Sequence, residues 1–181
     1  MKGLVNFVPA IIIYEKGVVA MGKYTIRNAV TADLNEIEKI YEYARGFMAA
    51  NGNPTQWQNG YPQRDMLEDD VAQGKLYAVL DDGKIVGVFM YAIGEDPTYS
   101  YIEDGAWLSD APYGTIHRIA SCKSGVFAAA LEFCRMQCNH VRVDTHADNK
   151  PMQHLAEKYG FQRCGTIYVE DGTPRIAYEL L

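Results

Sequence analysis

The sequence predicts an α/β fold: a mixed, mostly antiparallel sheet with helices on both faces. An apolar, strand-like segment at 115–120 leads into an amphipathic, helix-like run at 125–138, and a second strand-like segment follows at 141–145. Such a strand–helix–strand crossover produces a parallel strand pair. Candidate hairpins flank this unit on both sides, so antiparallel strands extend the same sheet.

Alternation of apolar and polar residues predicts the first strand of the domain at 24–28. A helix is expected to begin near Thr31–Asp33, because both end residues favour helix caps and an apolar stripe at helical spacing follows. That stripe consists of Leu34, Ile37, Ile40, Tyr41 and Ala44. The Asn-Gly-Asn-Pro sequence at 51–54 ends this helix, and a short helix is expected at 64–74.

A hairpin is predicted next, with strands at 76–80 and 85–93 joined by an Asp-Asp-Gly turn. A further strand is expected at 99–102, ahead of the crossover unit. After the crossover unit we expect a helix at 149–158. The two closing strands are expected near 165–170 and 176–180.

Composition places limits on the class of protein. The chain has 181 residues, 48% hydrophobic and 22% charged, which fits one globular domain with a sizeable core. A net charge of −6 argues against nucleic-acid binding, which usually requires a basic surplus. The same charge suits a cationic partner such as an amine, although mild acidity can also serve only solubility.

The first 22 residues are expected to be an accessory extension ahead of a single domain at 23–181. Lys2 precedes an apolar run, but Pro9 interrupts that run and charged residues end it early, so it is a poor signal peptide. No apolar run is long enough to cross a bilayer, and no membrane association is expected. As an alternative, these residues could add an edge strand to the sheet.

The four cysteines are expected to be free thiols. No Cys-x-x-Cys pair occurs, and no Cys/His spacing suits structural zinc, so no metal site is expected. Free thiols indicate a reducing, cytoplasmic location. The cysteines are Cys122, Cys134, Cys138 and Cys164.

The turn at 121–125, Ser-Cys-Lys-Ser-Gly, is the most informative segment of the chain. It is short, small and basic, and it connects the strand to the helix of the crossover unit. Free backbone N–H groups and the helix dipole converge at such a point, which favours a phosphate or pyrophosphate. Lys123 adds a point charge, unless it is simply solvated.

The segment from this turn to Tyr159-Gly160-Phe161 resembles the acetyl-CoA site of the GNAT N-acetyltransferases, and the resemblance extends from about Tyr24 to the C-terminus. The family's pyrophosphate loop, Q/R-x-x-G-x-G/A, aligns on Gly125 and places Cys122 and Phe127 at its other two defining positions. The resemblance implies a sheet of about seven strands whose central pair splays apart. The pantetheine arm of acetyl-CoA would lie in that gap and pair with one exposed strand.

The resemblance also implies which residues contact the cofactor. Asn149 follows the second splayed strand, where the family has an Asn that binds the arm; the same residue can cap a helix. The bulky Phe127 must turn toward the sheet to leave room for the pyrophosphate. The full expected set is Ile119, Ala120, Ser121, Lys123, Ser124, Gly125, Val126, Phe127 and Asn149.

Two catalytic residues are expected. The family's glutamate base falls near Thr115, and His117 shares a strand face with Thr115 and Ile119 and has a suitable pKa for proton transfer. His117 is therefore expected to act as the base or to order its water; the alternative is a histidine hydrogen-bonded at a polar strand end. The family's tyrosine acid falls on Ala156, so Tyr168 is the candidate acid.

The acceptor is expected to bind near the loop between the first two helices. Phe47, Trp57 and Tyr61 could line this pocket, or could instead fasten the loop to the core. Asp144 and His146 follow the second splayed strand and are candidate substrate contacts, with a solvated rim as the alternative.

The leading hypothesis is an N-acetyltransferase that moves an acetyl group directly from acetyl-CoA to a small amine or an amino-terminal acceptor. The alternative is a non-catalytic GNAT-like module that binds an acyl-CoA as a sensor or partner. The absent glutamate and tyrosine favour this alternative, whereas His117 favours an enzyme. A homodimer is an open option for the assembly.

Overall fold

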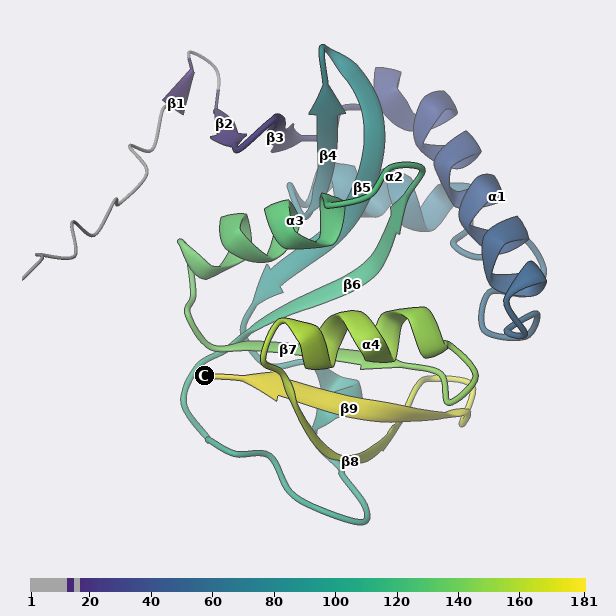
Figure 1. Cartoon of the computed structure of the whole chain (residues 1–181), viewed down its shortest axis with the longest axis vertical. Coiled ribbons are helices and arrows are strands. Elements are labelled where there is room, and N and C mark those ends of the chain that lie inside the picture. Colours follow the sequence, from purple (N-terminus) through teal and green to yellow (C-terminus); the bar gives the residue numbers. More distant parts are fainter. Residues whose placement is uncertain (1–12, 15–16) are drawn as a thin grey trace, which may run out of the picture.

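The computed structural model describes residues 13–14 and 17–181, and in these residues nine strands form one mixed sheet (Figure 1). The strand order is β1-β2-β3-β4-β5-β6-β7-β9-β8, and only the β6–β7 pair is parallel. This confirms the expected mixed, mostly antiparallel sheet. The strands are β1 Ile13–Tyr14, β2 Val18–Met21, β3 Tyr24–Asn28, β4 Leu76–Asp81, β5 Lys84–Ile93, β6 Gly114–Ser121, β7 Val141–Thr145, β8 Gln162–Tyr168 and β9 Pro174–Leu180.

Helices cover both faces of the sheet, as expected. In Figure 1, α3 and α4 lie in front of the sheet, and α2 lies behind it. The helices are α1 Leu34–Ala50, α2 Arg64–Ala72, α3 Val126–Arg135 and α4 Lys150–Lys158, with short 3-10 turns η1 Thr31–Asp33 and η2 Pro97–Tyr99. No helix in the described residues combines the length and apolar character needed to span a membrane.

Each face of the sheet has its own core. On the α3 side, Phe133 packs against Tyr77 and Phe89, whose rings stack with centroids 5.3 Å apart. On the α1 side, Leu34 and Ile37 are fully buried against the sheet. Burying each such side chain contributes about 1.5–3 kcal/mol, so the helices are fixed on the sheet by their apolar stripes.

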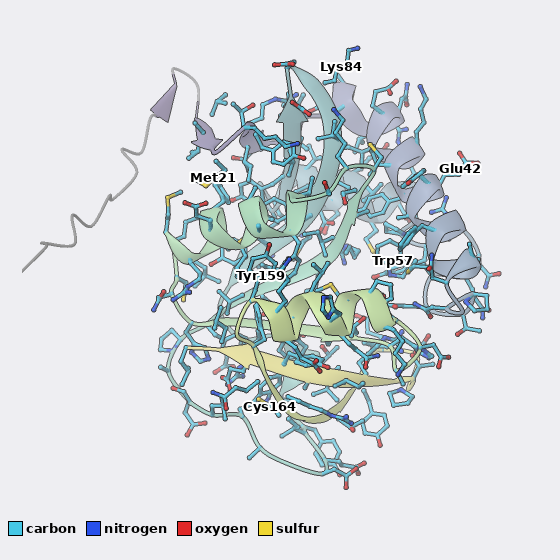
Figure 2. The ribbon with its side chains drawn as sticks, in the orientation of Figure 1. Met21, Glu42, Trp57, Lys84, Tyr159 and Cys164 are labelled. Atoms are coloured by element: carbon cyan, nitrogen blue, oxygen red, sulfur yellow. The ribbon has the colours of Figure 1, made fainter. Side chains whose placement is uncertain are left out.

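The N-terminal part of the described chain joins the sheet. Strand β2 pairs antiparallel with β3, and Met21 is buried in the α3-side core, as its position beside α3 in Figure 2 shows. Val18–Met21 therefore belong to the sheet rather than to an accessory extension, and the boundary expected at residue 22 falls inside a hairpin. The rest of the expected extension, 1–12 and 15–16, lies outside the described residues.

The strand expected at 99–102 is wrong. Residues Pro97–Tyr99 form η2 instead, and the nearby pairing is a single bridge between Glu103 and Thr166. The reason is local: the side chain of Asp96 accepts a hydrogen bond from the backbone N–H of Thr98, and Pro97 fixes φ in the first helical position.

Strands β6 and β7 separate soon after they meet, which confirms the expected splay. They pair only at Gly114 with Val141 and at Thr115 with Arg142. Beyond this point the two strands diverge toward the right of Figure 1, β6 rising toward the start of α3 and β7 running below α4. The sheet therefore contains a V whose closed end lies at Thr115.

A bulge in β6 re-aims the side chains along one arm of this V. Met90 of β5 pairs with His117, but Val88 pairs with Ala120, so β6 contains one extra residue. Arg118 takes the positive φ of 50° at this point. Because of the extra residue, Ile119 packs into the α3-side core and does not share the face of His117, contrary to the strict alternation expected from the sequence.

The closed end of the V gives a stability prediction. A methyl group on Gly114 would lie 2.3 Å from the hydroxyl of Tyr91, whose ring is buried. Gly114→Ala is therefore expected to lower the free energy of unfolding by about 1–3 kcal/mol through overpacking, measured by urea denaturation.

Gly46→Ala is the matched control for Gly114→Ala. Gly46 lies inside α1, and apart from the backbone of the helix itself and its chain neighbours no atom lies within 4 Å of the added methyl group. This change should raise stability by about 0.5–1 kcal/mol. Equal effects of the two substitutions would contradict the close packing at the closed end of the V.

Candidate functional site

The turn between β6 and α3 presents an open helix N-terminus. Gly125 is the N-cap residue with φ of 88°, a conformation that glycine adopts without strain, and no side chain caps the helix. The first N–H groups of a helix have no partner within it, so those of Val126 to Ala128 are free to bind a ligand. With the helix dipole they give this helix end a partial positive charge, which is the arrangement that suits an anion.

Contacts from neighbouring strands hold this turn in place. The buried Tyr24 donates its hydroxyl to the carbonyl oxygen of Ser124 at 2.7 Å. The backbone N–H of Cys122 donates to the carbonyl of Val86 at 3.0 Å. These bonds fix the path of the chain into α3, and so fix the direction of the helix end.

Lys123 lies in the same turn and carries the expected charge. Its ammonium pairs with Asp81 at 2.7 Å, and half of its side-chain surface is exposed. An exposed ion pair of this kind contributes only about 0–1 kcal/mol. Lys123 can therefore exchange Asp81 for a bound phosphate at little cost.

Phe127 does not block the turn. Its ring is buried and packs between α3 and α4, with centroids 5.5 Å from Tyr159 and 6.4 Å from Phe161. Figure 2 shows Tyr159 at the end of α4. The expectation that Phe127 turns away from the anion site agrees with this packing, and only its backbone N–H faces the helix end.

One edge of β6 is free along the open part of the V. Ala120 and Ser121 pair with β5 on one side, and in the described residues no strand pairs with their other side. The side chains of Ile119 and Val126 lie against the α3-side core. An extended ligand with amide groups can pair with such an edge as an added strand does.

His117 lies near the closed end of the V within a group of acids. Its Nε2 atom is 2.7 Å from Oδ2 of Asp96, and its Nδ1 atom is 3.6 Å from Oδ1 of Asp144 on β7. The buried Tyr99 donates its hydroxyl to the same Asp144 oxygen at 2.8 Å. The structure thus joins His117 and Asp144 and adds two residues, Asp96 and Tyr99, that sequence analysis missed.

The surroundings set the charges of this group. Burial opposes ionisation of Asp96, but hydrogen bonds from His117 and Thr98 lower its pKa to about 2. Burial, together with the nearby Asp144, raises the pKa of Tyr99 well above 10. Near neutral pH, Asp96 is therefore ionised and Tyr99 remains a hydrogen-bond donor.

Tyr168 is not part of this group, contrary to expectation. It lies on β8, an edge strand separated from β7 by β9. Its hydroxyl donates to Glu103, and its ring stacks on Tyr101 at 6.4 Å. The sequence cannot show this displacement, because it depends on the order of the last two strands in the sheet.

The aromatic residues of the α1–α2 loop are partly brought together. Trp57 meets Tyr41 edge-on at 5.6 Å and lies 6.3 Å from Tyr61; Figure 2 shows Trp57 on the side where α1 ends. The hydroxyl of Tyr41 donates to the carbonyl of Arg118 in the β6 bulge. Phe47 lies apart from this cluster, on the exposed surface of α1.

Asn149 caps α4, which is the alternative role that the sequence offered for it beside contact with the pantetheine arm. Its Oδ1 atom accepts the N–H of Met152 at 3.2 Å, and its Nδ2 atom donates to Gln56 of the α1–α2 loop at 2.9 Å. His146 instead contacts Asp148. The two candidate substrate contacts therefore have different partners, because Asp144 lies beside His117 and Tyr99.

The ionised Asp96 predicts a pH-dependent stability. Its folded-state pKa lies below the unfolded value of 3.8, so its contribution is complete above pH 4 and is lost as pH falls toward 2. Asp96→Asn should lower the free energy of unfolding by about 2 kcal/mol at pH 7. Urea titrations measure the difference in the free energy of unfolding between Asp96→Asn and wild type, and this difference should shrink below pH 4. Asp110→Asn, at an exposed position, should have the same free energy of unfolding as wild type.

Comparison with solved structures identifies the fold. A GNAT-family acetyltransferase from Streptococcus agalactiae 2603 superposes with a TM-score of 0.81 at 30% identity, over 90% of this chain and 97% of that chain. A GNAT-family acetyltransferase from Listeria monocytogenes 4b F2365 has a TM-score of 0.64 at 17% identity, covering 90% and 98%. The ribosomal-protein-S5-alanine acetyltransferase from Vibrio fischeri has a TM-score of 0.56 at 15% identity, covering 91% and 96%.

Comparisons with family models and with curated proteins do not identify the family. No family model matches the sequence, and no curated protein is detectably similar to it. The Streptococcus protein alone among these three is close enough in sequence to carry more than the fold. On that similarity over nearly the whole of both chains, together with the splayed strand pair and the open helix end, this chain belongs to the GNAT family of acetyltransferases.

Proposed function

We propose that this protein is an acetyl-CoA-dependent N-acetyltransferase that moves an acetyl group directly to an amine. One observation carries the proposal: the V between β6 and β7 has an uncapped helix N-terminus at its open side and a histidine held by acids near its closed end. A CoA thioester requires the first feature and an amine acceptor requires the second.

The residues of the V fit acetyl-CoA. The N–H groups at the start of α3 and the ammonium of Lys123 would hold the pyrophosphate. The free edge of β6 from Ile119 to Ser121 and the amide of Asn149 would hold the pantetheine arm. When bound, acetyl-CoA supplies an acetyl group activated as a thioester.

The amine must lose a proton before it can attack. A free alkyl amine has a pKa near 10.4, so its deprotonation at pH 7 costs about 4–5 kcal/mol. The short contact to Asp96 indicates that Nε2 of His117 carries a proton. Nδ1 lies 3.6 Å from Asp144, too far for a good hydrogen bond, so its lone pair is available to take a proton from an amine or a bridging water.

The two aspartates would stabilise His117 after it accepts this proton. An imidazolium between Asp96 and Asp144 is neutralised on both sides, as the orienting acids of other general bases achieve. Asp144 would also attract the ammonium form of the acceptor to the site. Tyr99, through its hydrogen bond, fixes the orientation of Asp144.

A small amine fits this site better than an anionic acceptor. Two carboxylates, Asp96 and Asp144, lie beside the base, and the described aromatic cluster of Tyr41, Trp57 and Tyr61 lies against the neighbouring bulge. Carboxylates and aromatic faces both favour a cation. An amino-terminal acceptor shares this chemistry, and an acceptor panel with both classes separates the two.

His117→Gln should reduce kcat/KM by about 10²- to 10⁴-fold, because it removes the proton acceptor but keeps a similar size. The assay is thiol release from acetyl-CoA over the amine panel. The Kd for CoA, measured by calorimetry, should stay unchanged. CoA binding by wild type with no thiol release for any amine would instead support the non-catalytic sensor.

Tyr24→Phe tests the anion site. It removes only the hydroxyl that holds Ser124, so CoA affinity should fall by about two- to twelvefold, the value of one hydrogen bond. Tyr43→Phe, on the exposed surface of α1, is the control and should bind CoA as wild type does. If wild type, Tyr24→Phe and Tyr43→Phe bind CoA with equal affinity, the proposal that the β6–α3 turn binds CoA is contradicted.

A further inference from the structure

Three side-chain amides link the loop after α1, a helix that packs on β6, to the residue that precedes α4. Oε1 of Gln56 accepts hydrogen bonds from Nδ2 of Asn53 at 2.7 Å and from Nδ2 of Asn149 at 2.9 Å. Asn53 and Gln56 lie in the loop that follows α1, whereas Asn149 follows β7. These bonds therefore tie the α1–α2 loop to the start of α4.

One member of this group lacks a partner. Asn53 is only 2% exposed, and its Oδ1 atom has no hydrogen bond in the described structure. A buried carbonyl oxygen without a donor is unfavourable, and such groups usually mark a place that a further donor fills. Asn53 Oδ1 therefore needs an N–H group that the free protein does not supply.

An amide ligand matches what these residues need. Nδ2 of Asn149 requires an acceptor and Oδ1 of Asn53 requires a donor, and one secondary amide offers both a carbonyl and an N–H. In the free protein the carbonyl of Gln56 accepts from the amides of both Asn149 and Asn53, but no group donates to Oδ1 of Asn53 in the described structure. The carbonyl of Gln56 thus takes the place that the carbonyl of a ligand amide would occupy beside Asn149.

We propose that Gln56 is an internal competitor for the amides of the pantetheine arm. In the free protein it occupies the amide of Asn149 and holds the α1–α2 loop at the start of α4. Binding of the arm displaces it and releases the loop. This inference rests on the proposed function, because it requires that CoA binds in the V.

Release of Gln56 would also affect the acceptor side. Trp57 is the next residue in the chain and packs on Tyr41, whose hydroxyl is bonded to the bulge beside His117. A loop freed at Gln56 can move Trp57 and open the aromatic cluster.

The test is calorimetry with free CoA on wild type, Gln56→Met and Gln58→Met. Gln56→Met keeps the size of the side chain but removes the acceptor, so it should bind CoA about three- to tenfold more tightly, as expected when one competing hydrogen bond is removed. Gln58 is exposed in the same loop, has no side-chain hydrogen bond in the described structure, and serves as the matched control. Gln58→Met should bind CoA as wild type does.

A second measurement needs no variant. Amide hydrogen exchange over residues 51–60 of wild type should accelerate when CoA is added, because the loop is released. In Gln56→Met the exchange should already be fast without CoA. Together these readouts report on the loop and not on turnover.

Each outcome separates the two proposals. If wild type binds no CoA, the proposed function fails. If wild type binds CoA but Gln56→Met binds it equally or more weakly, or Gln58→Met binds it more tightly as well, the competition is excluded. Slower or unchanged exchange at 51–60 in CoA-bound wild type also overturns it.

Discussion

The divergence of β6 from β7 is the constraint on which the rest of the molecule depends. Arg118 draws β6 toward the α1–α2 layer, because its guanidinium pairs with Asp70 at 2.5 Å and its carbonyl accepts the hydroxyl of Tyr41. Arg142, where β7 still pairs with β6, is anchored to the buried Glu179 of β9. Buried ion pairs add little net stability, but removing one partner is costly, so the two strands are held in these positions.

The anchoring of β7 also positions the acids around His117. Arg142 lies between the rings of Trp107 and Tyr113, at 4.0 and 3.9 Å from their centroids, and Trp107 donates its indole N–H to the carbonyl of Tyr99. The segment that carries η2 is thereby packed against β7. Because this segment lies against β7, the hydroxyl of Tyr99 reaches Asp144 on that strand.

Much of the fold could be predicted from the sequence, because local patterns determine its elements. Alternation at 24–28 and the apolar stripe from Leu34 correspond to β3 and α1. The turn ending in Gly125 was predicted as an anion site, since a strand that enters a helix through small residues leaves N–H groups free. These features depend on neighbours within a few residues.

The candidate site was harder to predict, because it depends on contacts distant in sequence. Asp96 and His117 are 21 positions apart and meet only because η2 folds back on β6. The Arg118 bulge has no clear signal in the sequence, although it reverses the face of Ile119. Tyr168 has the chemistry of an acid, but the strand order places it two strands from the V. In each case the chemistry of a residue is readable, but its position is not.

The same features explain why the site is open to ligands. A free strand edge, an uncapped helix end and the orphaned oxygen of Asn53 each leave backbone or amide groups without partners, which is unfavourable in a folded protein. The two aromatic and aliphatic cores offset that loss, since they bury large side chains such as Phe89 and Leu34 on both faces of the sheet. The free edge of β6 runs to the open end of α3, and the Asn53 oxygen lies in the loop bonded to the start of α4. The ligand proposed above, an extended molecule with a diphosphate and amides, would satisfy all three.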